Sequence, residues 1–343
     1  MKPPQAGMNP DKFLDMGLSF WSSRVLMVAV EKGVFSELTK GPKTLEQLIA
    51  HFKWHPRASR DFFDALVAMQ ALDRSDDGKY SNSQEADLFL VRDKPSYIGG
   101  LLEFSSVRLY ELWLKLENLL ETGGCQAPEE QEGRDFFAEL ARDQPAFKNF
   151  MRGMTGLATP QAEVIAAKFP WGKFKTFVDV GAAEGALPVR VCLAHPHLTG
   201  VSYDLPPSQA LFEEYVASFK LTDRLKFAKG DLREGPLPKT DVITLGHVLH
   251  GSSEEQRKTA IKKAFDALNP GGALLIYDAM VDPARRKNLT GMLSSLNIML
   301  ETVAGFEATT EQCSNWLKDA GFEKIVVEPV IGPNWMVYGF RPQ

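Results

Sequence analysis

Two histidines lie in the stretch LGHVLHGSSEEQ, residues 245–256, where an apolar run ends and a helix start follows. An imidazole at the end of a buried strand is a candidate proton acceptor, because its ordinary pKa lies close to neutral pH. Side chains alternate along a strand, so His247 and His250 are expected to face opposite sides, with His250 at the strand end and open to a cleft. A cap at Ser252 or Ser253 would start the next helix and mount His250 rigidly. A histidine that only bonds a neighbouring carbonyl is the alternative for His250, and a satisfied core histidine is the expectation for His247.

A glycine-rich turn follows another apolar run, in FVDVGAAEG, residues 177–185. Gly181 and Gly185 would let the backbone pass close to a ligand, and the helix after them would point its amides at the cleft. The turn departs from the dinucleotide fingerprint GxGxxG, because Ala183 stands where a pyrophosphate needs glycine. Asp179, at the strand end, suits a cationic ligand better than a phosphate.

Acidic residues also follow the next two apolar runs. Asp204 closes the second run in VSYDLP, about 20 residues beyond the first, where a carboxylate can accept both hydroxyls of a ribose. Asp231 follows the third run in KGDL and is placed to accept an adenine amine. Ligands of such sheets bind beyond the carboxyl ends of the strands. The glycine turn and the acids together form a more specific pattern than any one of them.

These residues need a parallel sheet to bring them together. From residue 175, five apolar runs alternate with helical segments, which is typical of a doubly wound α/β domain over 171–343. Two further runs, KIVVEPVI and NWMVYGFR, are joined only by GPN, which is too short for a parallel crossover. The sequence therefore predicts that the sheet ends in an antiparallel hairpin.

Residues 1–105 are expected to form a mostly helical unit of winged-helix type. Thr44 and Gln47 form a capping box at one helix start, and Asp77-Gly78 indicates a hairpin after two helices. DNA binding is disfavoured, because residues 1–100 hold thirteen basic and thirteen acidic side chains and the expected recognition helix is mostly apolar. A dimer interface is the better interpretation. Residues 106–170 are expected to be a helical linker that forms a lid over the substrate.

Composition favours a soluble enzyme with a small-molecule ligand. The 343 residues carry a net charge of -5 with no block of like charge, so nucleic acid and anionic membranes are not expected partners. The opening MKPPQAGMNP has no apolar leader, and no uninterrupted apolar run reaches the roughly 18 residues of a membrane span. A cytoplasmic location is the expectation. The three cysteines share no CxxC spacing, and no His, Asp and Glu cluster has metal-ligand spacing, so no metal is expected.

The chain resembles the class I S-adenosylmethionine-dependent methyltransferases, and more narrowly the small-molecule O-methyltransferases of the caffeate and acetylserotonin type. VDVGAAEG matches the glycine-rich motif of that family, YDLP its ribose motif, GDL its adenine motif, and ALNPGGALLIYDAM the segment entering its fifth strand. The resemblance covers nearly the whole chain. It implies a Rossmann-like, seven-stranded sheet preceded by a winged-helix dimerisation domain, and therefore a homodimer.

The resemblance also implies S-adenosylmethionine as the cofactor and S-adenosylhomocysteine as its product. Gly181 and Gly185 would contact the methionine part, Asp204 the ribose and Asp231 the adenine. The expected cofactor-binding residues are Asp179, Gly181, Gly185, Asp204, Leu205, Gly230, Asp231 and Leu232. The reaction implied is methyl transfer to a small molecule, above all to a hydroxyl of an aromatic compound or secondary metabolite.

In the family, a histidine at the end of the fourth strand is the general base, and His250 matches it. Asp278, where the family more often has Glu, and Glu307 match the acids that hold this histidine, and the substrate-lining residues expected are Met154, Asn297 and Met299. The chain departs from the family after the histidine, where Gly251 and Ser252 replace the usual Asp-Trp. That departure leaves two alternatives open: methyl transfer to a thiol or thioether, and a reaction other than methyl transfer on the same fold.

Overall fold

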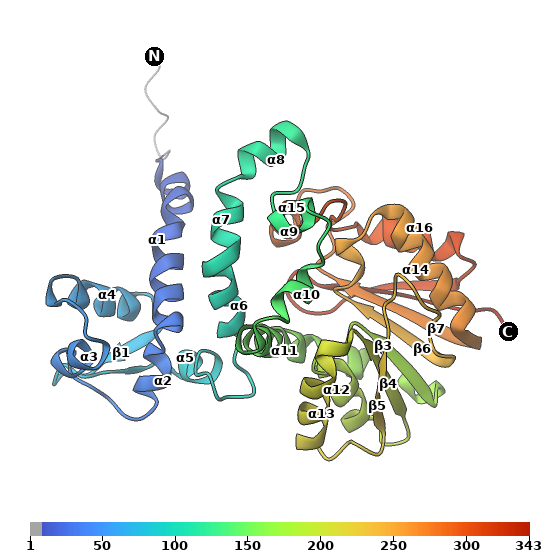
Figure 1. The fold of residues 1–343 in the computed structure, drawn as a ribbon, viewed down its shortest axis with the longest axis horizontal. Helices are drawn as coiled ribbons and strands as arrows, with labels where there is room; N and C mark the ends of the chain where they lie inside the picture. The colour runs from blue at the N-terminus through green and yellow to red at the C-terminus, as the bar shows by residue number, and fades with distance from the viewer. Residues whose placement is uncertain (1–8) are drawn as a thin grey trace. The chain divides into compact units, whose positions relative to one another are not determined.

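The computed structural model describes residues 9–343, and the chain divides into two compact units after Arg108 (Figure 1). The first unit contains the winged-helix elements, and the second begins at Leu109 and contains the sheet. A short π-helix, Ser105–Leu109, crosses this boundary. Most of the expected lid, 106–170, therefore belongs to the same unit as the sheet.

The first unit is mostly helical, as predicted. Its elements are α1 (Asp11–Glu31), α2 (Val34–Leu38), α3 (Leu45–Phe52), α4 (Pro56–Ala68), β1 (Leu72–Arg74), β2 (Tyr80–Asn82), α5 (Gln84–Phe89) and α6 (Gly99–Phe104). Thr44 and Gln47 form the capping box of α3, and β1 pairs with β2 in an antiparallel hairpin. Gly78 in the turn has φ +80°, a conformation that glycine adopts without steric cost. Phe35, Phe63 and Leu66 are fully buried at the centre of this unit.

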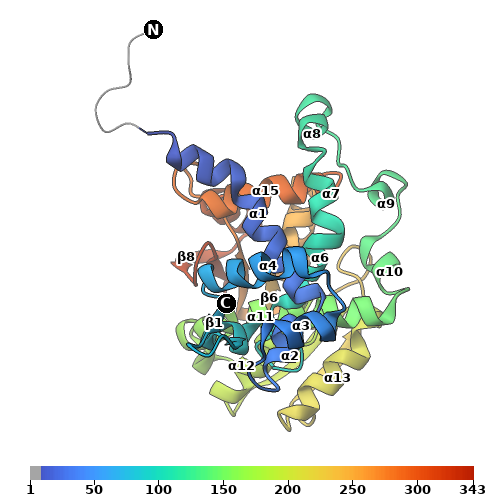
Figure 2. The same ribbon diagram turned by 90° about the vertical axis from the view of Figure 1, so that its left-hand side faces the viewer.

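Helix α1 is the long blue helix labelled in Figure 2, and many of its apolar side chains are exposed. Leu14, Leu18 and Trp21 follow a helical spacing and are 53%, 39% and 59% exposed. By length and composition α1 could also cross a membrane, with a mean hydropathy of 1.3 in an 18-residue window, although Arg24 interrupts its second half. We interpret the exposed row as a surface for a second copy of the chain, and a cytoplasmic location stays a prediction.

The second unit begins with five helices that precede the sheet. They are α7 (Tyr110–Trp113), α8 (Leu116–Thr122), α9 (Pro128–Gln131), α10 (Phe136–Leu140) and α11 (Gln144–Lys168). The remaining helices alternate with strands and are α12 (Ala186–Ala194), α13 (Gln209–Ser218), α14 (Glu254–Ala267), α15 (Leu289–Glu301) and α16 (Thr310–Asp319).

The sheet has seven strands in the order β5-β4-β3-β6-β7-β9-β8. Their bounds are β3 (Thr176–Val180), β4 (Thr199–Asp204), β5 (Leu225–Lys229), β6 (Thr240–Gly246), β7 (Leu268–Asp278), β8 (Glu323–Pro329) and β9 (Trp335–Phe340). The first five are parallel to their neighbours, while β9 is antiparallel to both β7 and β8. The predicted Rossmann-like sheet with an antiparallel hairpin is confirmed. Strand order reverses between β3 and β6, which marks the ligand-binding edge.

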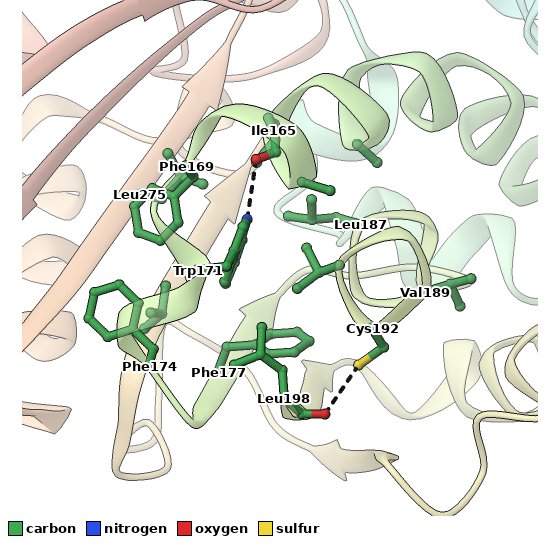
Figure 3. Close-up of a cluster of buried hydrophobic side chains, with 14 of the residues drawn as sticks. Ile165, Phe169, Trp171, Phe174, Phe177, Leu187, Val189, Cys192, Leu198 and Leu275 are labelled. Carbon is green, nitrogen blue, oxygen red and sulfur yellow. Dashed lines mark hydrogen bonds between the residues drawn. The ribbon is translucent and has the colours of Figure 1, made fainter. Parts of the chain in front are cut away.

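Two apolar cores hold helices on both faces of this sheet. Consecutive residues of β3 supply one side chain to each: Phe177 packs toward α11 and α12, and Val178 toward α14 and α16. Trp171, fully buried, donates its indole N–H to the carbonyl of Ile165 at 3.2 Å, which fixes the end of α11 against the sheet (Figure 3). The C-terminal end of α11 is therefore anchored to the apolar core beside the start of β3.

The exposed row on α1 leads to a prediction about assembly. Replacing both Leu14 and Trp21 by Ser should convert the dimer to a monomer, because it removes two large apolar contacts from a surface that depends on them. Light scattering after size exclusion should then give the 38.1 kDa of one chain rather than twice that mass. Leu193→Ser, at an exposed position of α12, is the matched control and should stay dimeric. A double variant that is still dimeric would show that α1 is not the interface.

Candidate functional site

The expected site residues converge at the carboxyl ends of neighbouring strands. Asp204 ends β4 and Asp278 ends β7, while Gly181 directly follows β3 and His247 directly follows β6. Asp231 follows β5, the outermost parallel strand. The topology therefore brings to one edge residues that are up to about a hundred positions apart in the sequence.

The glycine-rich turn after β3 requires glycine at both predicted positions. Gly181 has φ +71°, and a Cβ there would lie 2.5 Å from Cγ2 of Val248. Gly185 has φ +94° at the start of α12, and a Cβ would lie 3.0 Å from the Phe212 ring. Ala183 is also left-handed, with φ +51°, a conformation that costs an L-residue roughly 1–2 kcal/mol. A tight turn with its backbone exposed to the cleft is thus built at some energetic cost.

Asp204 is tied to this turn. Its Oδ2 accepts the Ala183 N–H at 2.7 Å and its Oδ1 accepts the Leu205 N–H at 2.6 Å. Burial raises the pKa of Asp204, and these two backbone hydrogen bonds partly oppose the effect. The Ser208 side chain also hydrogen-bonds this carboxylate, so three of its roughly four acceptor positions are used and one remains for a ligand hydroxyl. The carboxyl group is held in position without being saturated.

Asp179 is fully enclosed on β3 rather than open to the cleft. The Thr244 hydroxyl donates to its Oδ1, and burial raises the pKa of Asp179 to about 7. The carboxyl group is therefore partly protonated at neutral pH. A cation bound nearby would favour its ionised form and lower its pKa again.

Asp231 is paired with an arginine that the sequence interpretation did not consider. Arg233 donates to both carboxylate oxygens, with its Nε 3.0 Å from each, and its guanidinium also lies 3.0 Å from Asp135 at the start of α10. This pairing holds the pKa of Asp231 below its ordinary range. Gly230 next to it leaves room for the Tyr203 ring, which a Cβ would overlap at 2.0 Å. Leu232 packs against the core below.

The strand that was expected to end at His250 ends four residues earlier, at Gly246. His250 lies in a short 3-10 turn, Leu249–Gly251, and Ser253 rather than Ser252 caps α14 through a capping box with Gln256. The alternation argument therefore fails, because it applies only within a strand. His247 and His250 face the same carboxylate instead of opposite sides.

Three predicted catalytic side chains do meet at His250. Its Nδ1 lies 3.1 Å from Oδ1 of Asp278 and 3.4 Å from Oε1 of Glu307. A carboxylate only accepts, so Nδ1 carries the proton and the lone pair of the neutral ring is on Nε2. Among residues 9–343, Nε2 has no hydrogen-bonding partner. Both acids are buried, with Asp278 5% and Glu307 1% exposed.

The position of Glu307 follows from the loop before α16. Val281, just beyond β7, donates its N–H to the Ala308 carbonyl at 3.0 Å, which draws this loop to the strand end. The Ser294 hydroxyl on α15 donates to Oε1 of Glu307 at 2.7 Å. Glu307 is thus oriented from two sides toward His250.

The pKa of His250 is raised well above its ordinary 6.5. Burial acts to lower it, but the charges and hydrogen bonds of Asp278 and Glu307 outweigh burial. Burial likewise acts to raise the pKa of Asp278, but His250 and His247 hold it well below its ordinary range. The charges of the two acids therefore favour the protonated form of the His250 ring.

Buried Arg257 supports the His250 turn from behind. It donates to the carbonyls of Ser252, His250 and Phe306, and its guanidinium lies 3.9 Å from the centre of the Phe306 ring. These bonds tie the His250 turn to the loop that carries Glu307. Gly251, where the family has an acid, meets only Thr302 at 3.9 Å, so the space beside it is open. The sequence signal for Arg257 was a cation among helix positions that face the core, and it was missed.

The expected substrate-lining residues lie on α11 and α15. Asn297 accepts the indole N–H of Trp113 at 2.9 Å and donates to Glu301 at 2.5 Å. Met299 packs beside Leu300 in a small apolar cluster, and Met154 is partly exposed on α11. Asn297 and Met299 thus have structural contacts of their own, and the substrate role of all three stays a prediction.

Potential ligand atoms of His247, His250 and Asp278 lie within 4.8 Å of one another. The two separations to Asp278, 3.0 and 3.1 Å, are hydrogen-bond lengths between protonated nitrogens and an acceptor. We therefore interpret the group as a hydrogen-bond network.

Comparisons with known proteins agree with this arrangement. An O-methyltransferase domain model matches residues 113–323 and an O-methyltransferase dimerisation domain model matches 14–92. The chain is 38% identical to the tetracenomycin polyketide synthesis 8-O-methyl transferase of Streptomyces glaucescens over all of both proteins, and 31% identical to the N,N-dimethyltransferase OxyT of Streptomyces rimosus over 96% of each.

Solved structures show the same fold. Human N-acetylserotonin methyltransferase in complex with S-adenosylmethionine matches with a TM-score of 0.89 at 22% identity, over 99% of this chain and 100% of that one. PigF with S-adenosylhomocysteine matches with a TM-score of 0.86 at 22% identity, over 97% and 100%. The chain therefore belongs to the O-methyltransferase family and is an S-adenosylmethionine-dependent methyltransferase with its own dimerisation domain.

Proposed function

We propose that this enzyme methylates a hydroxyl oxygen of an aromatic small molecule, with His250 as the general base. The observation that carries the proposal is the asymmetry of the His250 ring. Its Nδ1 is fixed by Asp278 and Glu307, while its Nε2 has no hydrogen-bonding partner in the described part of the chain. This geometry lets Nε2 take the hydroxyl proton while the two acids stabilise the imidazolium that forms.

The glycine turn and its acids fit the cofactor. Gly181 is exposed in the turn, Gly185 lets the start of α12 pack against Phe212, and Asp204 keeps one acceptor position for a ligand hydroxyl. We propose that these residues hold the methionine part and the ribose, with Leu205 beside the ribose and Asp231, Gly230 and Leu232 around the adenine. The carboxylate of Asp179 would favour binding of the positively charged part of the cofactor. S-adenosylmethionine supplies an electrophilic methyl group on a sulfonium.

An aromatic polyketide phenol is the acceptor that the comparisons favour. The full-length relative at 38% identity is an 8-O-methyl transferase of tetracenomycin polyketide synthesis. A phenol suits a base of this kind, because its proton is acidic enough to pass to an imidazole as the oxygen attacks. The relative at 31% identity is an N,N-dimethyltransferase, so an amine nitrogen is the second candidate.

The first experiment is transfer of a labelled methyl group to polycyclic phenols, simple phenols, aromatic amines, thiols and thioethers. Phenols should be labelled, and His250→Asn should lose about two to four orders of magnitude in kcat with phenols, the scale of general-base effects. His197→Asn is the matched control, since His197 is exposed in the turn before β4. Labelling of amines or sulfur alone, or an equally fast His250→Asn, would contradict the proposal. No transfer to any acceptor would favour a reaction other than methylation.

The raised pKa of His250 predicts the pH profile. The base must first lose its resting proton, so kcat/KM should rise with pH and keep rising above 6.5, the ordinary pKa of the group. Asp278→Asn removes a negative charge from Nδ1, so the pKa of His250 falls and the rising limb should move to lower pH. The plateau should also fall, because a weaker base removes the proton less effectively. A limb that moves to higher pH in Asp278→Asn would contradict this assignment.

Arg233 offers a test of the adenine site. The Arg233 guanidinium donates hydrogen bonds to the Asp231 carboxylate, which we expect to accept the adenine amine. Arg233→Met should therefore tighten binding of S-adenosylhomocysteine. Arg233 is largely exposed, and exposed ion pairs contribute about 0.2–1 kcal/mol, so Kd should fall by less than about fivefold. Titration calorimetry measures this directly, with Arg142→Met, on an exposed pair with Glu139, as control. Weaker binding would show instead that Arg233 orients Asp231 for the ligand.

A further inference from the structure

His247 adopts a backbone conformation that turns its ring away from the line of β6. Its φ is +52°, in the left-handed region, and its N–H donates to the Tyr277 carbonyl at 3.1 Å. A histidine is an uncommon residue there and the conformation costs energy, so the contacts of its ring are worth following. Tyr277 covers one edge of the ring, with centroids 5.6 Å apart at 89°.

The ring of His247 shares one oxygen atom with the ring of His250. Both Nδ1 atoms lie next to Oδ1 of Asp278, at 3.0 Å for His247 and 3.1 Å for His250. The Ala279 N–H donates to the same oxygen at 3.0 Å. An acceptor that serves several donors gives less negative charge to each of them, so the two histidines compete for Asp278.

The other nitrogen of His247 reaches the helix expected to cover the substrate. Its Nε2 lies 2.9 Å from Oε1 of Gln161 on α11. Gln161 is buried and lies in the helix segment that Trp171 fixes through Ile165. Both ring nitrogens of His247 are therefore engaged, whereas His250 keeps Nε2 free. His247 cannot serve as a second base without breaking one of its contacts.

We propose that His247 is a positioning residue that shares Asp278 with His250 and connects this carboxylate to Gln161 on α11. Through this chain of contacts, the placement of α11 sets how much of the Asp278 charge His250 receives. The sharing of Asp278 stands on geometry alone, while its effect on catalysis rests on the proposed role of His250 as base.

The proposal fixes the direction of a measurable change. Without the His247 ring, Asp278 loses one of its donors and acts more strongly on His250. His250 then holds its proton to higher pH, so its pKa rises. The loss of one hydrogen bond to the Asp278 carboxylate is expected to raise the pKa of His250 by about 0.5–1. A mere loosening of the site would separate Asp278 from His250 and shift the pKa the other way.

Other charged groups around the two rings have to be kept in place for this test. They are Asp278 and Tyr277 on β7, Asp179 on β3, Glu307 before α16, Cys313 on α16, and Arg257 on α14. None of them is altered in the variants below.

The test is an NMR titration of the His250 ring in the full-length protein without substrate. The chain has six histidines, and the signal that disappears in His250→Asn identifies the one of interest. In His247→Asn, whose new residue tolerates a left-handed backbone, the pKa of His250 should rise by about 0.5–1. His197→Asn, at an exposed position in the turn before β4, is the matched control and should leave it unchanged. An unchanged or lower pKa of His250 in His247→Asn overturns the proposal.

Gln161→Leu tests the same connection from α11 and decides the matter if His247→Asn does not fold. It removes the partner of Nε2, so the His247 ring is held less firmly against Asp278. The pKa of His250 should therefore rise, by less than in His247→Asn, and an unchanged or lower value would count against the connection. The rising limb of kcat/KM should follow the titration in both variants. If the titration shifts as expected but His250→Asn remains active, the connection stands and only the role of His250 as base fails.

Discussion

A single buried carboxylate, Asp278, organises the catalytic edge of this methyltransferase. Taking an ion out of water costs several kcal/mol unless partners compensate, and Asp278 is only 5% exposed. It recovers that cost from two imidazole N–H donors and a backbone N–H on one oxygen. The turn after β6, the end of β7 and, through Gln161, helix α11 all meet at this group. The geometry of the site therefore depends on keeping Asp278 ionised and dry.

Much of the architecture could be predicted from the sequence, because it follows from local patterns. Alternating apolar runs and helical segments indicate the parallel sheet, and the GPN turn indicates its antiparallel end. The acids after the strands converge because parallel strands place their carboxyl ends at one edge. Asp278 and Glu307 were assigned beside His250 through a family resemblance, and the structure brings all three within hydrogen-bonding or ion-pairing distance.

The features that could not be predicted are those that depend on distant parts of the chain. The strand was predicted to continue to His250, because no local sequence pattern indicates a left-handed backbone at a residue other than glycine, as found at His247. Gln161 is 86 residues from His247, and Arg233 meets Asp135 across 98 residues. Arg257 is in register with the core-facing positions of α14, but no local pattern identifies the rings of Phe306 and Trp316 beside it. Sequence patterns identify which residues face inward but not which of them become partners.

The bare backbone at Gly251 has a consequence for how this enzyme can diversify. The residue directly follows the base, yet a Cβ there would meet only one methyl group at ordinary contact distance, and φ does not require glycine. Arg257 and the Phe306 N–H both donate to the His250 carbonyl and hold the turn in place, so the turn does not depend on packing by a side chain at position 251. Side chains of different size and charge can enter beside the base without disturbing the fold. Single substitutions at position 251 can therefore change the space beside His250, and with it the methyl acceptor that fits, at little cost in stability.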